Sequence, residues 1–262
     1  WTDTTNGNSN IKTVNIVEAI KPTSCYRFFN KCRNLVEIKN IQNLYTNECT
    51  NMVLMFNYCT SLTSLDVNNF DTSKVNDIKA MFQACKSLKV LDVSHFDTSN
   101  VTDMRYMFAL SNALTSINGL KNFDTSNVTN MSYMFYKCTA ITSLDVSNFD
   151  TSKVIDMDTM FNGCRSLSTI KGLDSFNTSN VKNMSRMFAN GEDYTGSGKL
   201  TNLKISNWDT HNVTDMTCMF YGQGTQTDLD VSNWDVSNCT SFNHMFCDNF
   251  SLQSLDLSKW NT

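Results

Sequence analysis

An aspartate that recurs in the segment Leu-Asp-Val is the most regular candidate for chemistry in this chain of 262 residues. Three further copies of the segment carry a neutral or basic residue at its place. On an exposed strand face these side chains would form one column, in which neighbouring like charges repel. The column is either a solvated face that opposes aggregation or a recognition surface. Its members are Asp66, Asp92, Asn118, Asp145, Lys171, Lys204, Asp230 and Asp256.

Recognition by this column would depend on the places where Lys171 and Lys204 interrupt the acids. Calcium bridging between neighbouring aspartates is a weak alternative, because the spacing of a calcium-binding loop is absent. We assign no metal site and no cofactor to the chain.

Ten cysteines are the second group that could do chemistry. Five of them occupy one place, three residues after a Met-Phe pair or, for Cys32, after Phe28-Phe29: Cys32, Cys59, Cys85, Cys138 and Cys164. Because cysteine behaves as a small buried hydrophobe, we expect a ladder of packed thiols. Disulfides between Cys25 and Cys32, or between Cys239 and Cys247, remain open from the spacing. A zinc site would require paired ligands that the cysteines and the 3 histidines do not supply.

Catalytic motifs are absent from the sequence, which contains no nucleophile elbow, phosphate-binding loop, dinucleotide fingerprint or HExxH helix. Every candidate acid, base or nucleophile falls on a place that the repeat described below explains structurally. We therefore expect a protein that is not an enzyme and has no catalytic residues.

The sequence contains an internal repeat of about 26 residues, and each copy supplies the elements that position these side chains. An aromatic residue before an Asp-Thr-Ser-like segment marks each copy, with spacings of 26, 27, 26, 27, 32, 26 and 26 residues between Phe70 and Trp260. A fixed period of this length indicates a solenoid. We expect residues 1–24 to be an N-terminal cap or lead-in, and residues 25–262 to form one solenoid of about nine units.

Each unit combines two hydrophobic periods. Leu65, Val67 and Asn69 alternate at period 2 in the segment 62–70, which predicts a short strand with Asp66 on its outer side. Apolar residues in the segment 73–88 recur at helical spacing, which predicts a short helix. Side-chain oxygens of the Asp-Thr-Ser segment would cap that helix and make the turns, since the chain has only 1 proline and 9 glycines.

Two departures from the repeat stand out. The segment 190–199 inserts extra residues that include Glu192, Asp193 and Tyr194. Insertions of this kind are either tolerated surface loops or binding loops. The next unit loses its Cys and Leu in the segment 221–228, so we expect the two departures to form one feature. Gly119 and Gly172 occur in units one residue longer than the others, where we expect bulges.

The strand segment resembles the leucine-rich repeat pattern L-x-x-L-x-L-x-x-N, with Phe or Trp in the ninth place. The full unit, as in Leu91–Phe108 (LDVSHFDTSNVTDMRYMF), looks like the BspA-type, DUF285-like repeat of bacterial surface proteins and mycoplasma lipoproteins. The resemblance implies an α/β repeat solenoid, with short parallel strands on one side and short helices on the other. It also implies an extracellular bacterial protein attached to the cell surface and active in adhesion.

Function and partners follow from this resemblance as expectations. We expect a non-catalytic surface module that recognises a protein or glycan on a host or neighbouring cell; a spacer rod without its own ligand is the alternative. The net charge of −4 argues against nucleic acid as a partner. The longest apolar runs are too short to span a membrane, so we expect membrane attachment only through an anchor outside this segment, which we take as part of a longer protein.

Overall fold

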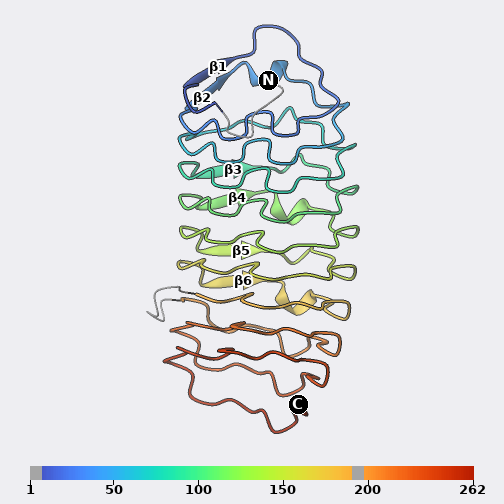
Figure 1. The fold of residues 1–262 in the computed structure, drawn as a ribbon, viewed down its shortest axis with the longest axis vertical. Helices are drawn as coiled ribbons and strands as arrows, with labels where there is room; N and C mark the ends of the chain where they lie inside the picture. The colour runs from blue at the N-terminus through green and yellow to red at the C-terminus, as the bar shows by residue number, and fades with distance from the viewer. Residues whose placement is uncertain (1–7, 191–197) are drawn as a thin grey trace.

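The computed structural model describes residues 8–190 and 198–262 and shows coils stacked along one axis (Figure 1). Few residues are in regular elements, and all of those elements are three residues long. Six short strands and three 3-10 helices are defined within the described residues. They are β1 Thr13–Asn15, β2 Glu37–Lys39, η1 Ile41–Asn43, β3 Val90–Asp92, β4 Ser116–Asn118, η2 Leu120–Asn122, β5 Ser143–Asp145, β6 Thr169–Lys171 and η3 Leu173–Ser175.

The strands pair in parallel between successive coils, as the repeat predicts, but they form three separate pairs instead of one sheet. β1 pairs with β2, β3 with β4, and β5 with β6. Because β1 already pairs with β2, the ladder begins well before residue 25. The strand side of the predicted solenoid is therefore present in part, since the segment 62–70, for which a strand is predicted, has none assigned.

The second strand of every pair is followed by a residue with a left-handed backbone and then by a 3-10 helix. Asn40, Gly119 and Gly172 occupy this left-handed position. The carbonyl of the preceding residue accepts the amide N–H of the adjacent coil, as in the 2.9 Å bond from Val146 to Lys171. The extra residue of the longer units thus makes a tight turn, and the bulge predicted at Gly119 and Gly172 is replaced by this left-handed turn.

The predicted helices are wrong. In the segment 73–88, Ala80 and Ala84 have positive φ angles of 54° and 57°, which a right-handed helix does not contain. The backbone instead makes successive turns, with bonds such as Met81 N–H to the carbonyl of Ile78 at 3.1 Å. Alternate amides donate to the next coil, as Phe82 does to the carbonyl of Met107 at 2.9 Å.

Spacing alone could not separate these two conformations. Ile78, Met81, Phe82 and Cys85 all point inward and are buried, as the helical pattern requires. Two successive four-residue turns give the same inward positions as two helical turns. The stack favours the turns because they leave every second amide free to bond the neighbouring coil, whereas a helix would use those amides internally.

The core is a row of stacked aromatic rings along the solenoid axis. Phe82 lies 5.7 Å from Phe56 and 6.0 Å from Phe108, with nearly parallel rings, and Phe135 continues the row at 5.7 Å from Phe108. All of these side chains are at most 1% exposed. The Phe of each Met-Phe pair, one of the periodic apolar residues of its unit, therefore lies in the core.

Threonines of the Asp-Thr-Ser segments form a second, polar ladder inside the coils. Thr72 and Thr98 are buried, and each hydroxyl donates to a backbone carbonyl of the next coil at 2.9 Å. The aspartate before each threonine accepts the amide N–H of the serine after it, as Asp97 does from Ser99 at 3.0 Å. These side chains therefore make turns as predicted, although no helix is present for them to cap.

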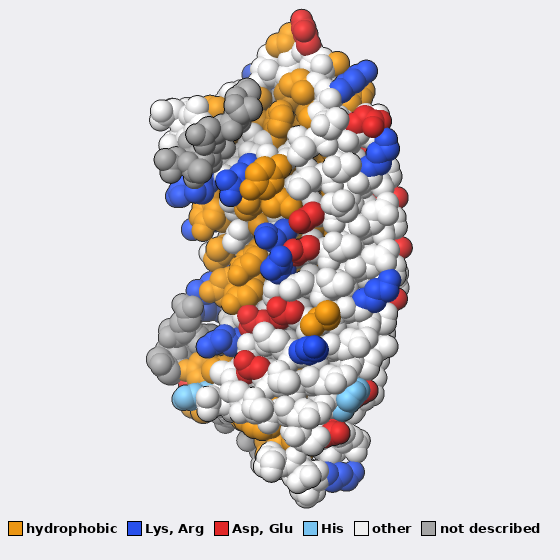
Figure 2. Space-filling view, turned by 45° about the vertical axis from the view of Figure 1, so that its right-hand side comes forward, with side chains coloured by type: hydrophobic (Ala, Val, Ile, Leu, Met, Phe, Trp, Pro, Cys, Tyr) orange, Lys and Arg blue, Asp and Glu red, His pale blue; other side chains and the backbone are white. Residues whose placement is uncertain are grey.

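One face of the stack is shown in Figure 2, where hydrophobic side chains gather in an interrupted vertical stripe. Charged side chains of both signs lie beside this stripe, and the surface to the right of it in the view is mostly uncharged, with separate acidic and basic side chains near the right-hand edge. Within residues 8–190 and 198–262, no helix has the length and apolar character needed to cross a membrane.

Candidate functional site on the strand face

The column of Leu-Asp-Val acids lies on the outer strand face, and none of its eight members is buried. Each of its five aspartates accepts the backbone N–H of the residue two positions later, at 2.9–3.2 Å. This is an Asx turn, in which the carboxyl group shapes its own loop. The acids are therefore turn-forming groups first, and one oxygen of each is already engaged.

The turn contacts also hold some of these carboxyl groups ionised. The Ser147 hydroxyl donates to Asp145 at 2.5 Å, and together with Lys171 it lowers the pKa of Asp145 to about 2. Hydrogen bonds from Ser94 and Ser258 lower the pKa of Asp92 and Asp256 in the same way. These aspartates consequently carry a full negative charge at neutral pH.

Two of the three substitutions in the column have a backbone explanation. Asn118 and Lys171 each precede a left-handed glycine, and the turn at that glycine replaces the Asx turn. Lys171 also forms an ion pair with Asp145, with a 2.9 Å distance between Nζ and Oδ2. The glycine turns, together with the ion pair of Lys171, therefore explain why these two positions of the column do not carry aspartate.

Lys204 is different from the rest of the column. It has neither an Asx acceptor nor a following glycine, and it is exposed. The coil that carries it has no strand assigned, so β6 lacks a strand partner on this side within the described residues. The backbone turn after Lys204 is nevertheless kept by the 3.1 Å bond from Trp208 N–H to the carbonyl of Ile205.

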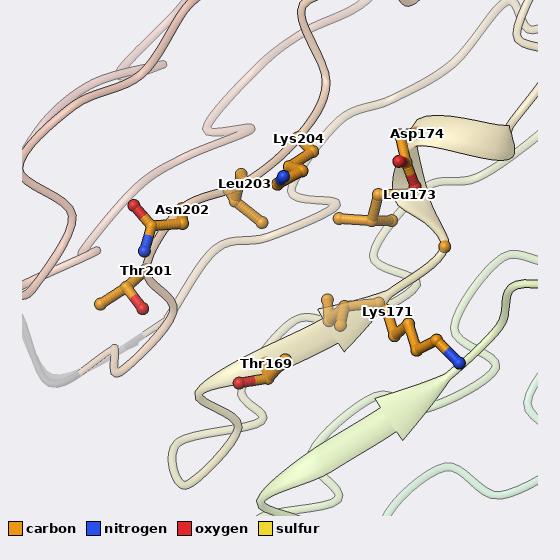
Figure 3. A pocket seen from close by; sticks show the side chains of 10 residues that line it. Thr169, Lys171, Leu173, Asp174, Thr201, Asn202, Leu203 and Lys204 are labelled. Atoms are coloured by element: carbon orange, nitrogen blue, oxygen red, sulfur yellow. The ribbon is translucent and has the colours of Figure 1, made fainter.

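A groove of about 420 Å³ opens where the strand pairing stops, between β6 and the segment 201–204. We call it the Lys204 groove. Its lining includes two lysines, one aspartate, three hydroxyl or amide side chains and three aliphatic side chains (Figure 3). The lining residues are Thr169, Ile170, Lys171, Gly172, Leu173, Asp174, Thr201, Asn202, Leu203 and Lys204.

The two lysines of the Lys204 groove differ in the direction of their side chains and in their contacts. In Figure 3 the Lys171 side chain runs from the end of β6 toward the neighbouring strand, away from Lys204, as its ion pair with Asp145 in β5 requires. Lys204 also lines an adjoining groove of about 640 Å³ that continues to Asp228 and Asp230. Lys204 thus lies at the junction of two grooves that follow the strand face.

A third groove, of about 530 Å³, lies on the same face nearer the N-terminus. Asp66, Asp92 and Asn118 line it, beside Lys89. It occupies the gap before β3, where the preceding coil again has no assigned strand. Grooves on this face therefore coincide with interruptions of the strand pairing, and most of the predicted column lines one of them.

The two predicted departures from the repeat do meet in space. Asn190 N–H donates to the carbonyl of Tyr221 at 2.7 Å, and Gly198 N–H donates to the carbonyl of Gly222 at 3.2 Å. The Thr225 hydroxyl donates to the carbonyl of Gly198 at 3.2 Å. Both described ends of the insertion are thus attached to the segment 221–228; Glu192, Asp193 and Tyr194 lie outside the described residues.

The glutamines of that segment are structural. Gln223 takes the place of the ladder cysteine, is fully buried, and donates its amide to the carbonyl of Phe188. Gln226 takes the place of the ladder leucine and is also buried. Neither side chain is presented to a partner at the surface.

The five ladder cysteines are buried, as predicted, and no disulfide is present among the described cysteines. The thiols of Cys59, Cys85, Cys138 and Cys164 donate to the carbonyl of the phenylalanine in the preceding coil, as Cys59 does to Phe29 at 3.2 Å and Cys164 to Phe135 at 3.0 Å. Ser111 makes the same bond with its hydroxyl, at 2.9 Å to Phe82. Burial raises the pKa of the Cys85 and Cys164 thiols to about 12, which keeps them protonated.

Metal binding has no support in the described part of the chain, where no three His, Cys, Asp or Glu side chains are grouped to hold an ion. The strand face instead offers a cation at a groove junction, hydroxyl and amide groups, and small aliphatic surfaces. Such an arrangement can bind an anionic or hydroxyl-rich partner by ion pairing and hydrogen bonding.

Comparisons with known proteins identify the repeat. A search of curated proteins finds no match. One solved structure, a leucine-rich repeat protein from Bacteroides ovatus ATCC 8483, is similar over 86% of this chain and 82% of that chain, at 14% identity and a TM-score of 0.23, which is too low to support an argument. A family model described as "Mycoplasma protein of unknown function, DUF285" matches residues 23–118, 110–203 and 195–262. The chain therefore belongs to the DUF285 family.

Proposed function

We propose that this chain is a non-catalytic binding module of a bacterial cell surface, and that it recognises a protein or glycan on another cell through the Lys204 groove. The observation that carries the proposal is the exception at Lys204. The five aspartates of the column each form an Asx turn, whereas Asn118 and Lys171 each precede a glycine whose left-handed turn replaces the Asx turn. Lys204 keeps a cation on an exposed strand face where the turn does not use it.

The chemistry of the groove favours a partner that carries a carboxylate. Lys204 supplies the positive charge, while Thr201 and Asn202 supply hydrogen-bonding groups beside it. Leu173 and Leu203 give apolar contact area. Acidic side chains of a protein and acidic sugars of a glycan both offer these complementary features.

Arrays of cell-surface glycans and proteins test the proposal directly. The purified chain is expected to bind a subset enriched in acidic components, and the Lys204→Glu variant is expected to lose that subset. A chain that is folded by circular dichroism yet binds no array component would contradict the binding proposal. Binding that is unchanged by Lys204→Glu would place the site elsewhere.

A spacer rod is the alternative function, and the continuity of the stack supports it. Isolated bridges link successive coils without a break from Asn51 through Asp77, Asp103, Asn130, Asp156, Asn183 and Asp215 to Ser241. A ladder of this kind stiffens the molecule along its axis, because each coil is bonded to both neighbours. A silent array together with a rigid, elongated particle in small-angle scattering would favour the spacer.

A further inference from the structure

Two cysteines outside the ladder lie against each other in the first coils of the stack. The Sγ atoms of Cys25 and Cys49 are 3.0 Å apart, and both side chains are completely buried. The contact joins two neighbouring coils across 24 positions of sequence. It differs from the two pairings considered from the sequence, Cys25 with Cys32 and Cys239 with Cys247.

The repeat shows that both positions depart from their columns. Cys25 stands where later coils carry Ile78 or a methionine such as Met104, seven residues before the ladder position. Cys49 stands where later coils carry a valine such as Val75 or Val101. In those coils the two columns are apolar and buried. Two thiols replace the apolar pair at one level of the stack.

A second cysteine in the column of Cys49 can be compared with this pair. Cys239 occupies the same column as Cys49, but the preceding coil supplies Met216 at the position of Cys25. Cys239 therefore has a methionine in the column where Cys49 has a thiol. Cysteine in one column alone is tolerated as a packed thiol, whereas cysteine in both columns creates a pair.

The backbone holds the pair in place from both sides. Cys25 N–H donates to the carbonyl of Asn51 at 2.9 Å, and Thr50 N–H donates to the carbonyl of Thr23 at 3.1 Å. These bonds run between the same two coils on either side of the thiols. A disulfide needs the sulfur atoms to approach to about 2.05 Å, which is a movement of about 1 Å from the present contact.

We infer that Cys25 and Cys49 form a disulfide that cross-links the first two described coils of the stack when the protein meets a disulfide-bearing oxidant. The oxidant is a small-molecule disulfide or the disulfide of an oxidoreductase. The Cys49 thiolate attacks one of its sulfur atoms and releases the first oxidant thiol, giving a mixed disulfide. The Cys25 thiolate then displaces the second oxidant thiol, so that two protein thiols are oxidised and one oxidant disulfide is reduced.

The hydrogen-bond arrangement agrees with this order of events. Either thiol can donate across the 3.0 Å contact, but the Cys49 thiol also donates to the carbonyl of Pro22 at 3.2 Å, which leaves its sulfur to accept from Cys25. The contact with Cys25 lowers the pKa of Cys49. Cys49 is therefore the thiol that ionises first. The ladder thiols Cys85 and Cys164 differ, because burial raises their pKa and each donates to a phenylalanine carbonyl without accepting from a second thiol.

The position of the pair in the stack indicates which part of the fold the disulfide would stabilise. Each coil of a solenoid contacts only the coils beside it, so a covalent bond between two neighbouring coils stabilises their interface directly. A bond between Cys25 and Cys49 would join the coil that carries β1 to the coil that carries β2, the first two coils of the described ladder. The inference concerns stability in an oxidising compartment and does not depend on the proposed binding function.

Mapping of the disulfide by mass spectrometry tests the inference on the full chain. The protein is equilibrated with oxidised and reduced glutathione, its free thiols are alkylated under denaturing conditions, and the peptides are analysed without reduction. We expect one cross-linked species that joins Cys25 to Cys49, with the other eight cysteines alkylated. Alkylation of all ten cysteines at every glutathione ratio, or a bond from Cys25 to another cysteine, would overturn the inference.

Thermal unfolding of oxidised and reduced protein adds a second readout with controls taken from the repeat itself. Oxidation should raise the unfolding midpoint of the wild type by roughly 5–10 °C, because the cross-link restricts the unfolded chain. Cys49→Val restores the residue of that column and should abolish the shift. Cys85→Ser copies Ser111 and should retain it. A shift that survives in Cys49→Val would assign the effect to other thiols.

Discussion

Side chains with short polar groups determine the path of this backbone. A chain with 1 proline and 9 glycines must make its turns by other means, and here Asp and Asn accept the N–H two residues later at the corners of the coils. The Leu-Asp-Val acid belongs to this set. Its regular recurrence therefore reports turn formation, and the binding site that we propose rests on the exception at Lys204.

Stability at acid pH should reveal these turn contacts. Asp145 has a native pKa of about 2, below its ordinary value, because hydrogen bonds from Ser147 and Lys171 stabilise the carboxylate. The corresponding stabilisation is complete above about pH 4 and is lost as the pH falls toward 2, since the unfolded state then binds the proton more readily. Urea unfolding from pH 2 to pH 6 should show this decline in the wild type.

Substitutions at Asp145 separate the turn from the charge. Asp145→Asn keeps the acceptor oxygen, loses the ion pair, and should show a smaller dependence of unfolding free energy on pH. Asp145→Ala loses both and should be less stable by about 1 kcal/mol at neutral pH. Equal pH dependence in the wild type and Asp145→Asn would show that this carboxyl group is not responsible.

Pairing between strands depends on the longer units. At Gly172 the backbone has a φ angle of 96°, and a Cβ atom there would lie 2.3 Å from the Cα atom of Ser147 in the neighbouring coil. The glycine therefore permits both the left-handed turn and the close approach of β5 and β6. The same holds at Gly119, where a Cβ atom would lie 2.2 Å from Ser94 Cα.

Substitution of Gly172 by alanine should consequently be severe. We expect Gly172→Ala to lower the free energy of unfolding by at least about 2 kcal/mol, through overlap with backbone that cannot move alone. Gly163→Ala is the matched control: its φ angle is 72°, but the nearest atom to its new Cβ belongs to the flexible Lys137 side chain. Urea unfolding should show a loss of about 1 kcal/mol or less for the control, and similar losses for both variants would refute the account.

The strand side and the core were predictable from sequence, whereas the opposite side was not. Alternation around Leu65 and Val67 and the recurrent Phe of the Met-Phe pair indicated which side chains face inward, although the segment 62–70 has no assigned strand. Left-handed residues such as Ala80, Leu54 and Tyr106 carry no glycine signal that would reveal the turns. Bonds between coils impose that conformation, and a local pattern within one unit does not contain them.

At the scale of the whole molecule, the candidate site arises between units. Lys171 and Lys204 could be named from the sequence because they break a column. The difference between them depends on Gly172 and on the Asp145 contact, which appear only when the coils are stacked. The Lys204 groove likewise exists because β6 has no strand partner beyond it within the described residues, and no single unit encodes that gap.

The affinity of Lys204→Glu for the strongest-binding array component tests the central claim most directly. Lys153→Glu is the control, because Lys153 is also an exposed lysine but donates to Asn127 at 2.7 Å, away from the groove. We predict at least about tenfold weaker binding for Lys204→Glu, a loss of about 1.4 kcal/mol, and a change below about twofold for Lys153→Glu. Equal affinities of the two variants would contradict a binding site at the Lys204 groove.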